Sequence, residues 1–395
     1  MTQALGVLLV GSKGAVATTV QAAWAARRAG LPIAFSLPSQ TDPAFAKIPL
    51  VDMADMVFGG WDVVGQSGSN AARRHGVVPR AVIDAVADTL DAVPCFPGIR
   101  LAAEAMPEPT DAGPHVGRPV LVGAPLRPVA HAIRDDIRRF QADNVLSRVV
   151  VVNLCSTEPL PVAGPEHDTI EAFEAAIDAG SPRISTGMIY AWAALSEGCP
   201  FVNFTPSVTF DIPALLALAI REGVPLAGKD GKTGQTLYKT VIAPMLRQRG
   251  LRVKGWFSTN ILGNQDGLVL NDPEHVATKR ASKLSVLPKI LGYDDFEHQV
   301  NIHYYPPRGD AKEAWDNVDF EGWFGVPMQI KINWLGWDSI LAAPLVVDLV
   351  RWMDFFDAQG EAGLLPHLAS YFKHPLGTDE NSLFDQVELL RRHLR

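Results

Sequence analysis

The first thirty residues combine an apolar strand, a glycine turn and a helix. Residues 6–10 are apolar, residues 11–17 are Gly-Ser-Lys-Gly-Ala-Val-Ala, and a helical pattern extends to about Ala29. In doubly wound α/β folds, this order of elements places a pyrophosphate at the N-terminus of the helix. The spacing is G-x-x-G-x-x-A and not the full G-x-G-x-x-G, so a plain tight turn explains it equally well. A dinucleotide bound here would contact the turn residues Gly11, Ser12, Lys13, Gly14, Ala15 and Val16.

Later segments are typical of a parallel sheet. Residues 148–154 form a valine-rich run of the kind buried in such sheets. Ser156 and Thr157 follow at the strand's C-terminal end, where these folds bind ligands, although a helix cap explains both residues too. A strand predicted at 32–37 ends without an acidic residue for a ribose or an arginine for a 2′-phosphate, and the missing arginine favours NAD over NADP. The other elements predicted in this part are helices at 79–93, 129–143, 171–179, 188–196 and 212–222, and strands beginning at Phe201 and Pro225.

The composition narrows the class of partner. With 35 basic and 43 acidic residues the net charge is −8, so the basic face of a nucleic-acid-binding protein is not expected. A locally basic pocket in an acidic protein suits a small anionic substrate better. Hydrophobic residues make up 47% of the 395, which allows a sizeable core and two domains.

The cysteines and the N-terminus indicate a compartment. Cys95, Cys155 and Cys199 are odd in number, lie far apart and have no metal-ligand spacing, so we expect reduced thiols and no metal site. No basic leader is evident, and no apolar run approaches the roughly 20 residues that span a bilayer. We therefore expect a cytoplasmic protein without a membrane partner.

Residues 228–283 are dense in groups that handle phosphate and protons. They begin Gly-Lys-Asp-Gly-Lys-Thr-Gly-Gln-Thr and continue with a helix at 237–245 and a strand at 253–259. Asp272 and Pro273 favour the start of another helix, which places Lys279 and Lys283 on one face. Two such lysines are either solvated surface residues or an anion site in which one lysine acts as a base. Spacing alone does not decide between these readings.

The rest of the chain predicts a second sheet and a return to the first domain. Strands are predicted at 300–305, 323–326 and 328–334, followed by an apolar helix at 341–356. We expect a doubly wound nucleotide-binding domain formed by residues 1–227 and 340–395. An α+β domain with one open sheet would occupy residues 228–339.

Several motifs, in this order, resemble the myo-inositol-1-phosphate synthases, and the compact chain is most similar to the archaeal type. Gly60-Trp61-Asp62 matches a motif whose acid lies in the NAD site of that family. The others are residues 230–236, 260–267, 282–283, 309–312, 337–345 and 371–375. The resemblance covers nearly the whole chain.

The resemblance implies an NAD enzyme that converts glucose 6-phosphate to an inositol phosphate. Oxidation at C5, enolisation, intramolecular aldol closure and re-reduction leave no net redox change, and the family's sheet domain builds a homotetramer. Matched by position, the active site would contain Lys279, Lys283, Lys312, Lys373, Asp230, Asp266, Asp310, Asp338, Asn260 and Asn264. The cofactor site would contain Asp62, Ser156, Thr157, Thr186 and Asp230 beside the glycine turn.

Other functions stay open at this point. Lys229 stands where eukaryotic members have an acid, and a divergent relative could cyclise another hexose phosphate, such as fructose 6-phosphate, to a five-membered cyclitol. A simple NAD-dependent dehydrogenase would explain the first domain but would leave four matched lysines without a role. A non-catalytic NAD-binding scaffold would be expected to have lost at least one of these lysines.

Overall fold

The chain divides into two compact units in a computed structural model that describes residues 4–32, 36–101, 114–263, 286–309 and 311–395. The first unit comprises Met1–Asp230 and Ala343–Pro366, and the second comprises Gly231–Ala342 and His367–Arg395. The sequence had suggested that residues 340–395 belong with the nucleotide-binding domain. The structure instead groups residues 367–395 with the second unit.

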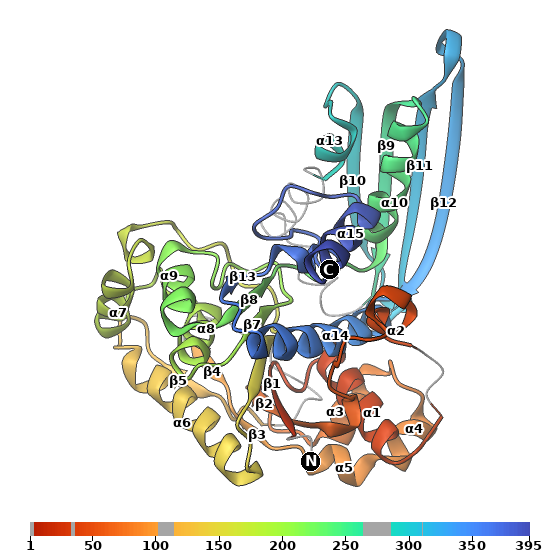
Figure 1. The fold of residues 1–395 in the computed structure, drawn as a ribbon. Helices are drawn as coiled ribbons and strands as arrows, with labels where there is room; N and C mark the ends of the chain where they lie inside the picture. Colours follow the sequence, from red (N-terminus) through yellow and green to blue (C-terminus); the bar gives the residue numbers. More distant parts are fainter. Residues whose placement is uncertain (1–3, 33–35, 102–113, 264–285, 310) are drawn as a thin grey trace. The chain divides into compact units, whose positions relative to one another are not determined.

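A seven-stranded parallel sheet forms the centre of the first unit (Figure 1). Its order is β13-β8-β7-β6-β1-β2-β3, so the chain winds outward from β1 in both directions. This is the predicted doubly wound arrangement, with its switch point between β1 and β6. The strands are β1 (Leu5–Val10), β2 (Met56–Asp62), β3 (Cys95–Pro97), β6 (Val149–Asn153), β7 (Phe201–Asn203), β8 (Pro225–Gly228) and β13 (Gly363–Leu364).

Helices cover both faces of this sheet. Trp24 of α1 packs on Phe58 of β2 with ring centroids 5.2 Å apart, and Tyr190 of α8 packs on Trp61 of β2 at 5.3 Å. Since Phe58 and Trp61 are three residues apart on one strand, their side chains point to opposite faces. The helices are α1 (Ala15–Arg28), α2 (Pro38–Thr41), α3 (Gly68–His75), α4 (Arg80–Ala85), α5 (Ala87–Asp91), α6 (Arg127–Asn144), α7 (Ile170–Ala179), α8 (Thr186–Ser196) and α9 (Pro213–Glu222). A small separate sheet pairs β4 (Ile99–Leu101) with β5 (Arg118–Val120).

Residues 33–35, the middle of the strand predicted at 32–37, lie outside the described residues. β1 pairs with β2, which the sequence did not predict, in register from Leu5–Met56 to Val10–Trp61. β2 was not predicted from the sequence because its two glycines lower the strand propensity. They are needed there: a Cβ on Gly59 would lie 2.7 Å from the Phe140 ring of α6, and one on Gly60 would overlap the Leu9 carbonyl oxygen.

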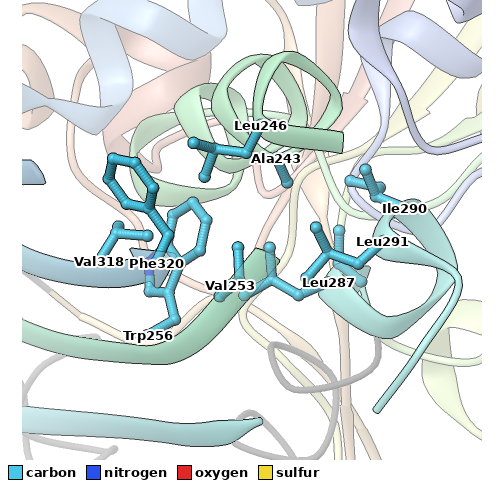
Figure 2. Close-up of a cluster of buried hydrophobic side chains, with 10 residues drawn as sticks. Ala243, Leu246, Val253, Trp256, Leu287, Ile290, Leu291, Val318 and Phe320 are labelled. Carbon is cyan, nitrogen blue, oxygen red and sulfur yellow. The ribbon is translucent and has the colours of Figure 1, made fainter. Parts of the chain in front are cut away.

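The second unit is built on a four-stranded sheet of order β10-β9-β11-β12. Its strands are β9 (Arg252–Leu262), β10 (Glu297–Tyr304), β11 (Ala311–Glu321) and β12 (Pro327–Trp337), and its helices are α10 (Gly234–Gln248), α13 (Val286–Leu291) and α15 (Leu383–His393). The division between the units falls within α14 (Asp338–Ala358). Figure 2 shows the core, where Leu246 of α10 and Leu287 of α13 pack with Trp256 of β9 and Val318 of β11.

Two predictions for this sheet need correction. β11 was not expected from the sequence, although it is central in the sheet. Residues 323–326 were expected as a strand, but Trp323–Gly325 is a 3₁₀ turn that joins β11 to β12, with Phe324 at φ 62°. Other short 3₁₀ turns lie at Pro43–Phe45, Met53–Asp55, Pro165–His167, Pro306–Arg308 and Pro366–Tyr371. Among the described helices, none has both the length and the apolar character to cross a membrane.

Candidate functional site

The glycine turn after β1 is held against the end of β2. The N–H groups of Gly11 and Ser12 both donate to the Trp61 carbonyl at 2.9 Å, and the Gly14 N–H donates to the Gly11 carbonyl at 3.0 Å. The Lys13 N–H donates to the Asp62 carboxylate at 2.7 Å. The amides of the turn itself are therefore used within the protein. An anion bound here would be met by the first turn of α1.

The N-terminus of α1 suits such an anion. Gly14 is the N-cap and no side chain caps the helix, so its first N–H groups lack the usual partner. Gly11 has φ +85°, and a Cβ on it would lie 3.1 Å from the Leu154 carbonyl oxygen. A side chain at Gly11 would thus be strained and would crowd the end of β6. These features fit a pyrophosphate group of a dinucleotide.

The predicted turn residues have different surroundings. Ser12 and Lys13 are buried, and the Ser12 hydroxyl accepts a hydrogen bond from Gln21 Nε2 at 3.0 Å. Gly11, Gly14, Ala15 and Val16 are partly exposed. Solvent therefore reaches the turn at its first glycine and at its helical end.

Asp62 braces the turn and is not a free surface residue. Its carboxylate accepts the N–H of Lys13 at 2.7 Å and that of Val64 at 3.0 Å. Burial raises the pKa of Asp62, against the lowering effect of these backbone N–H groups. The Asp62 side chain is therefore part of the structure that holds the turn.

The loop after β6 contacts the start of α8 through the side chain of Glu158. Ser156 and Thr157 are exposed. Neither residue caps a helix, so the helix cap that was the alternative explanation for them is wrong. Glu158 instead accepts the Gly187 N–H at the start of α8 at 3.1 Å. The buried hydroxyl oxygen of Thr186 has no hydrogen-bond partner in the described part of the chain. Thr186 therefore offers a polar atom to a ligand at this edge.

Asp230 follows β8 at the same C-terminal edge of the sheet. Its N–H donates to the carbonyl of Thr205, which follows β7, at 3.1 Å. Its φ is +61°, a backbone conformation that few residues other than glycine, asparagine and aspartate adopt. In parallel strands these C-terminal ends share one edge, so the segments after β1, β2, β6, β7 and β8 lie along it.

In the second unit, the structure brings Lys312, Lys373 and Asp338 together. Lys312 Nζ lies 2.9 Å from Asp338 Oδ2. Burial would raise the pKa of Asp338, but the charges of Lys312 and Lys373 and hydrogen bonds from Lys312 and Thr233 outweigh it and lower that pKa to about 2. The cluster thus holds two ammonium groups around one carboxylate.

Three chain segments form this cluster. Lys312 lies opposite Gly336 in the β11–β12 ladder, just before the chain reaches Asp338. The Lys232 N–H donates to the Tyr371 carbonyl at 2.8 Å, which ties the segment before α10 to the one that carries Lys373. The cluster also adjoins α10, because a Cβ on Gly234, the first residue of that helix, would lie 3.4 Å from Asp338 Oδ1. No side chain caps α10. The cluster and this helix terminus are suited to a phosphate.

Asn260 lies on β9 in the same unit and is fully buried. Its Nδ2 donates to Gln235 Oε1 at 2.7 Å. Its Oδ1 is buried without a hydrogen-bond partner among the described residues. Gln235 is the second residue of α10, so Asn260 is linked to the start of that helix.

Two further lysines of this unit are buried. Burial lowers the pKa of Lys232 to about 7 and that of Lys239 to about 8, despite the opposing charges of Glu380 and Asp316 respectively. Lys232 Nζ donates to the side-chain oxygen of Gln386 on α15. Both lysines differ from the Lys312 cluster, where a carboxylate is in direct contact.

Several predicted site residues lie outside the described residues. These are Lys279, Lys283, Asn264, Asp266 and Asp310. Sequence reasoning in turn gave no role to Thr233, Gln235 or Asp316. The first two stand in the polar motif at 230–236, which was the available signal. Asp316 gave no signal, because its strand was not recognised.

Comparisons with known proteins agree with this arrangement. A model of an NAD-binding family, described as myo-inositol-1-phosphate synthase, matches residues 39–395. An inositol-3-phosphate synthase of Bacteroides thetaiotaomicron is 41% identical, over 100% of this chain and 95% of the relative. The crystal structure of an inositol-3-phosphate synthase from Caenorhabditis elegans has a TM-score of 0.88 at 23% identity, covering 99% of this chain and 85% of that one. A myo-inositol-1-phosphate synthase-related protein from Thermotoga maritima has a TM-score of 0.76 at 25% identity, covering 99% and 98%.

Proposed function

Because the chain belongs to the myo-inositol-1-phosphate synthase family, we propose that it converts D-glucose 6-phosphate to 1D-myo-inositol 3-phosphate. The reaction is an isomerisation by carbon–carbon bond formation and uses NAD catalytically. The observation that carries the proposal beyond family membership is the cluster of Lys312, Lys373 and Asp338. A simple dehydrogenase has no need of such a cluster.

The first unit holds the cofactor in this proposal. Bound NAD supplies a hydride acceptor at the start of the reaction and a hydride donor at its end. The uncapped N-terminus of α1 would hold the pyrophosphate, while Asp62 keeps the glycine turn in place. Ser156, Thr157, Thr186 and Asp230 would contact the nicotinamide half, in agreement with their place at the C-terminal edge of the sheet.

The second unit supplies charge for the sugar phosphate. Lys312 and Lys373 would bind the phosphate or polarise the oxygens on which negative charge develops. Asp338 would keep Lys312 oriented through their ion pair, with the charge of Lys373 beside the same carboxylate. Asn260 would accept a hydrogen bond from a sugar hydroxyl through its unpaired Oδ1.

The remaining catalytic assignments rest on the matching of motifs. We propose that Lys283 handles the proton of the C5 hydroxyl and that Lys279 stabilises an oxyanion. Asn264, Asp266 and Asp310 would orient the sugar or the lysines. None of these residues lies in the described part of the chain.

One incubation tests the proposed function. The protein is mixed with glucose 6-phosphate and NAD⁺, and the product is identified by phosphorus and proton NMR. We expect an inositol phosphate without net NADH. Failure to turn over glucose 6-phosphate, with conversion of fructose 6-phosphate to a five-membered cyclitol phosphate, would reassign the substrate. NADH formed in proportion to sugar consumed would indicate a dehydrogenase.

We also propose a cytoplasmic homotetramer assembled through the second unit. Trp323 and Phe324 in the turn between β11 and β12 are 87% and 97% exposed, and Trp315 and Leu335 on these strands are about half exposed or more. Apolar patches of this kind mark protein–protein contacts. The three free cysteines are in keeping with a reducing compartment.

A further inference from the structure

A buried carboxylate on β11 gathers four hydrogen bonds. Asp316 Oδ1 accepts from Trp256 Nε1 at 2.7 Å and from the Ser258 hydroxyl at 2.5 Å. Asp316 Oδ2 accepts from Gln235 Nε2 at 2.6 Å and from the Tyr238 hydroxyl. Asp316 is only 3% exposed, so these bonds compensate for its removal from water.

The surrounding donors show that Asp316 acts here only as an acceptor. An indole N–H can donate but not accept. Burial, and next the charge of Asp316, raise the pKa of Tyr238, so its hydroxyl stays protonated and donates. The amide of Gln235 must therefore present its nitrogen, and not its oxygen, to Asp316.

This orientation is passed on to Asn260. With Nε2 facing Asp316, Gln235 turns Oε1 toward Asn260, whose Nδ2 donates to it at 2.7 Å. The Asn301 carbonyl, 3.5 Å from Nδ2, favours the same orientation. Asn260 Oδ1 is then the atom that stays unpaired among the described residues.

We propose that Asp316 is a positioning residue that acts through Gln235 to fix the amide of Asn260, so that Asn260 offers an acceptor to a hydroxyl of the substrate. The inference rests on the proposed function and deepens it. Asp316 itself does not touch the substrate. Its role is to set which end of the Asn260 amide is available.

Replacing Asp316 by Asn would reverse the chain of amides. The amide introduced by D316N would keep its oxygen toward Trp256 and Ser258 and would turn its NH₂ toward Gln235. Gln235 would then flip and present Nε2 to Asn260, which would flip in turn and offer a donor in place of an acceptor. Either this flip or a mispaired buried amide is expected, and both impair the enzyme.

A second substitution should repair the first. In D316N/N260D, the carboxylate introduced on β9 accepts from the flipped Gln235 and still offers an acceptor with its other oxygen. N260D alone places a carboxylate against Gln235 Oε1, so it should be harmful. The proposal therefore predicts that two harmful changes restore function when combined. Total charge is the same in the double variant and the wild type.

The experiment measures kcat/KM for formation of inositol phosphate and the Tm of all variants. We expect D316N and N260D each to lose at least about tenfold in kcat/KM, and the double variant to exceed both. The matched control is D319N, because Asp319 on the same strand accepts amides of Asn317 and Gln329 at 2.7 and 3.0 Å at the exposed surface. D319N should retain wild-type activity.

A second rescue keeps the test valid if D316N does not fold. In Q235E/D316N the carboxylate introduced on α10 accepts from both the new amide on β11 and Asn260, which restores the original orientation of Asn260. If neither double variant recovers folding or activity beyond D316N, the proposed relay from Asp316 through Gln235 to Asn260 is wrong. It is also wrong if D316N behaves as D319N does.

The proposed function and the proposed role of Asp316 can fail separately. If the wild type forms no inositol phosphate, the proposed function fails, and the Tm of the same variants still tests the relay. Coupling in Tm, with the double variant melting above the less stable single variant, supports the relay without any substrate. An active wild type with purely additive losses would overturn the relay alone.

Discussion

At the level of residues, the second unit contains both partly exposed paired charges and buried lysines. Asp338 has a pKa of about 2 because two ammonium groups outweigh its burial, so it is a carboxylate at any pH near neutrality. Lys232 has lost most of its preference for the charged form, because it is buried and its partner is the neutral side chain of Gln386. The lysines of this unit thus have different surroundings: Lys312 is paired with a carboxylate, whereas Lys232 is buried against a neutral amide.

Replacement of Lys373 by Ala tests the catalytic role of the lysine cluster around Asp338. We expect turnover to fall by at least about 10²-fold, because a preorganised cation is lost where negative charge develops. NAD affinity, measured by calorimetry, should stay within a few-fold. K283A is expected to behave similarly. The exposed Lys254 provides the control K254A, which should keep full activity. Comparable activity in K373A would remove Lys373 from the mechanism.

Replacement of Lys232 by Met tests the lowered pKa of this buried lysine through the free energy of unfolding. The folded-state pKa of about 7 lies below the ordinary value of 10.5, so the unfolded state binds the proton more strongly between these values. The wild type should therefore gain free energy of unfolding relative to K232M as pH rises through this window, by up to about 1.4 kcal/mol per pH unit. Below about pH 7 the difference should become constant.

Urea unfolding at about pH 7, 8 and 9 measures this slope directly. The same series on K254M, which changes an exposed lysine, should run parallel to the wild type. If the K232M curve also runs parallel, Lys232 does not titrate within the window and its environment is less apolar than its burial suggests.

Among the elements, the turn between β1 and α1 requires a glycine at position 11, where φ is +85°. Gly11→Ala would place a side chain at φ +85°, close to the Leu154 carbonyl, at a cost of about 1–2 kcal/mol. We expect NAD affinity to fall about tenfold by calorimetry. Gly30→Ala carries similar strain at the other end of α1, with φ +70° and open space around it. It should lower stability but leave NAD affinity intact, and equal effects of both variants on affinity would contradict the assigned cofactor site.

The hairpin of β11 and β12 tests the oligomer. Trp323→Glu with Phe324→Glu should shift the protein from tetramer to a smaller species in light scattering, because charge is introduced into the proposed contact. The adjacent exposed pair Leu121 and Val122 in the first unit allows a matched control, L121E/V122E. An unchanged mass for the hairpin variant would exclude the turn from the interface.

The same elements show what the sequence could and could not predict. Strands such as β1 and β6 were correctly predicted because their apolar runs match burial in a parallel sheet. β11 has the sequence Ala-Lys-Glu-Ala-Trp-Asp-Asn-Val-Asp-Phe-Glu, whose acidic residues disfavour a strand, and its neighbours β9 and β12 override that preference. The turn at 323–325 was wrongly predicted as a strand because its aromatic residues are typical of strands. The signal for a turn was the pair of glycines, Gly322 before it and Gly325 at its end.

The site was predictable to the extent that its residues stand in motifs. The glycine turn, Asp62, Lys312 and Asp338 could be named from the sequence, and the structure places them at the sheet edge and in the lysine cluster. Residues such as Thr233 and Asp316 could not be assigned roles. Their importance comes from partners that lie far away in the sequence, Asp338 and Trp256 respectively.

The whole molecule combines a nucleotide-binding unit with a unit that carries a lysine cluster around Asp338. An enzyme that released an oxidised sugar would leave NADH bound and would need another oxidant. The lysines of the second unit are suited instead to hold a carbonyl compound and its enolate through the aldol step. The reaction is therefore expected to be redox-neutral, with the hydride taken from C5 returning to the same carbon.

Substrate labelled with deuterium at C5 follows this hydride through the reaction. Glucose 6-phosphate carrying the label is incubated with the protein and substoichiometric NAD⁺, and the product is analysed by NMR. We predict an inositol phosphate that keeps the deuterium on the ring carbon derived from C5, with no growing NADH absorbance. Steady growth of NADH absorbance in proportion to sugar consumed, or loss of the label from that carbon, would show that the hydride does not return to C5.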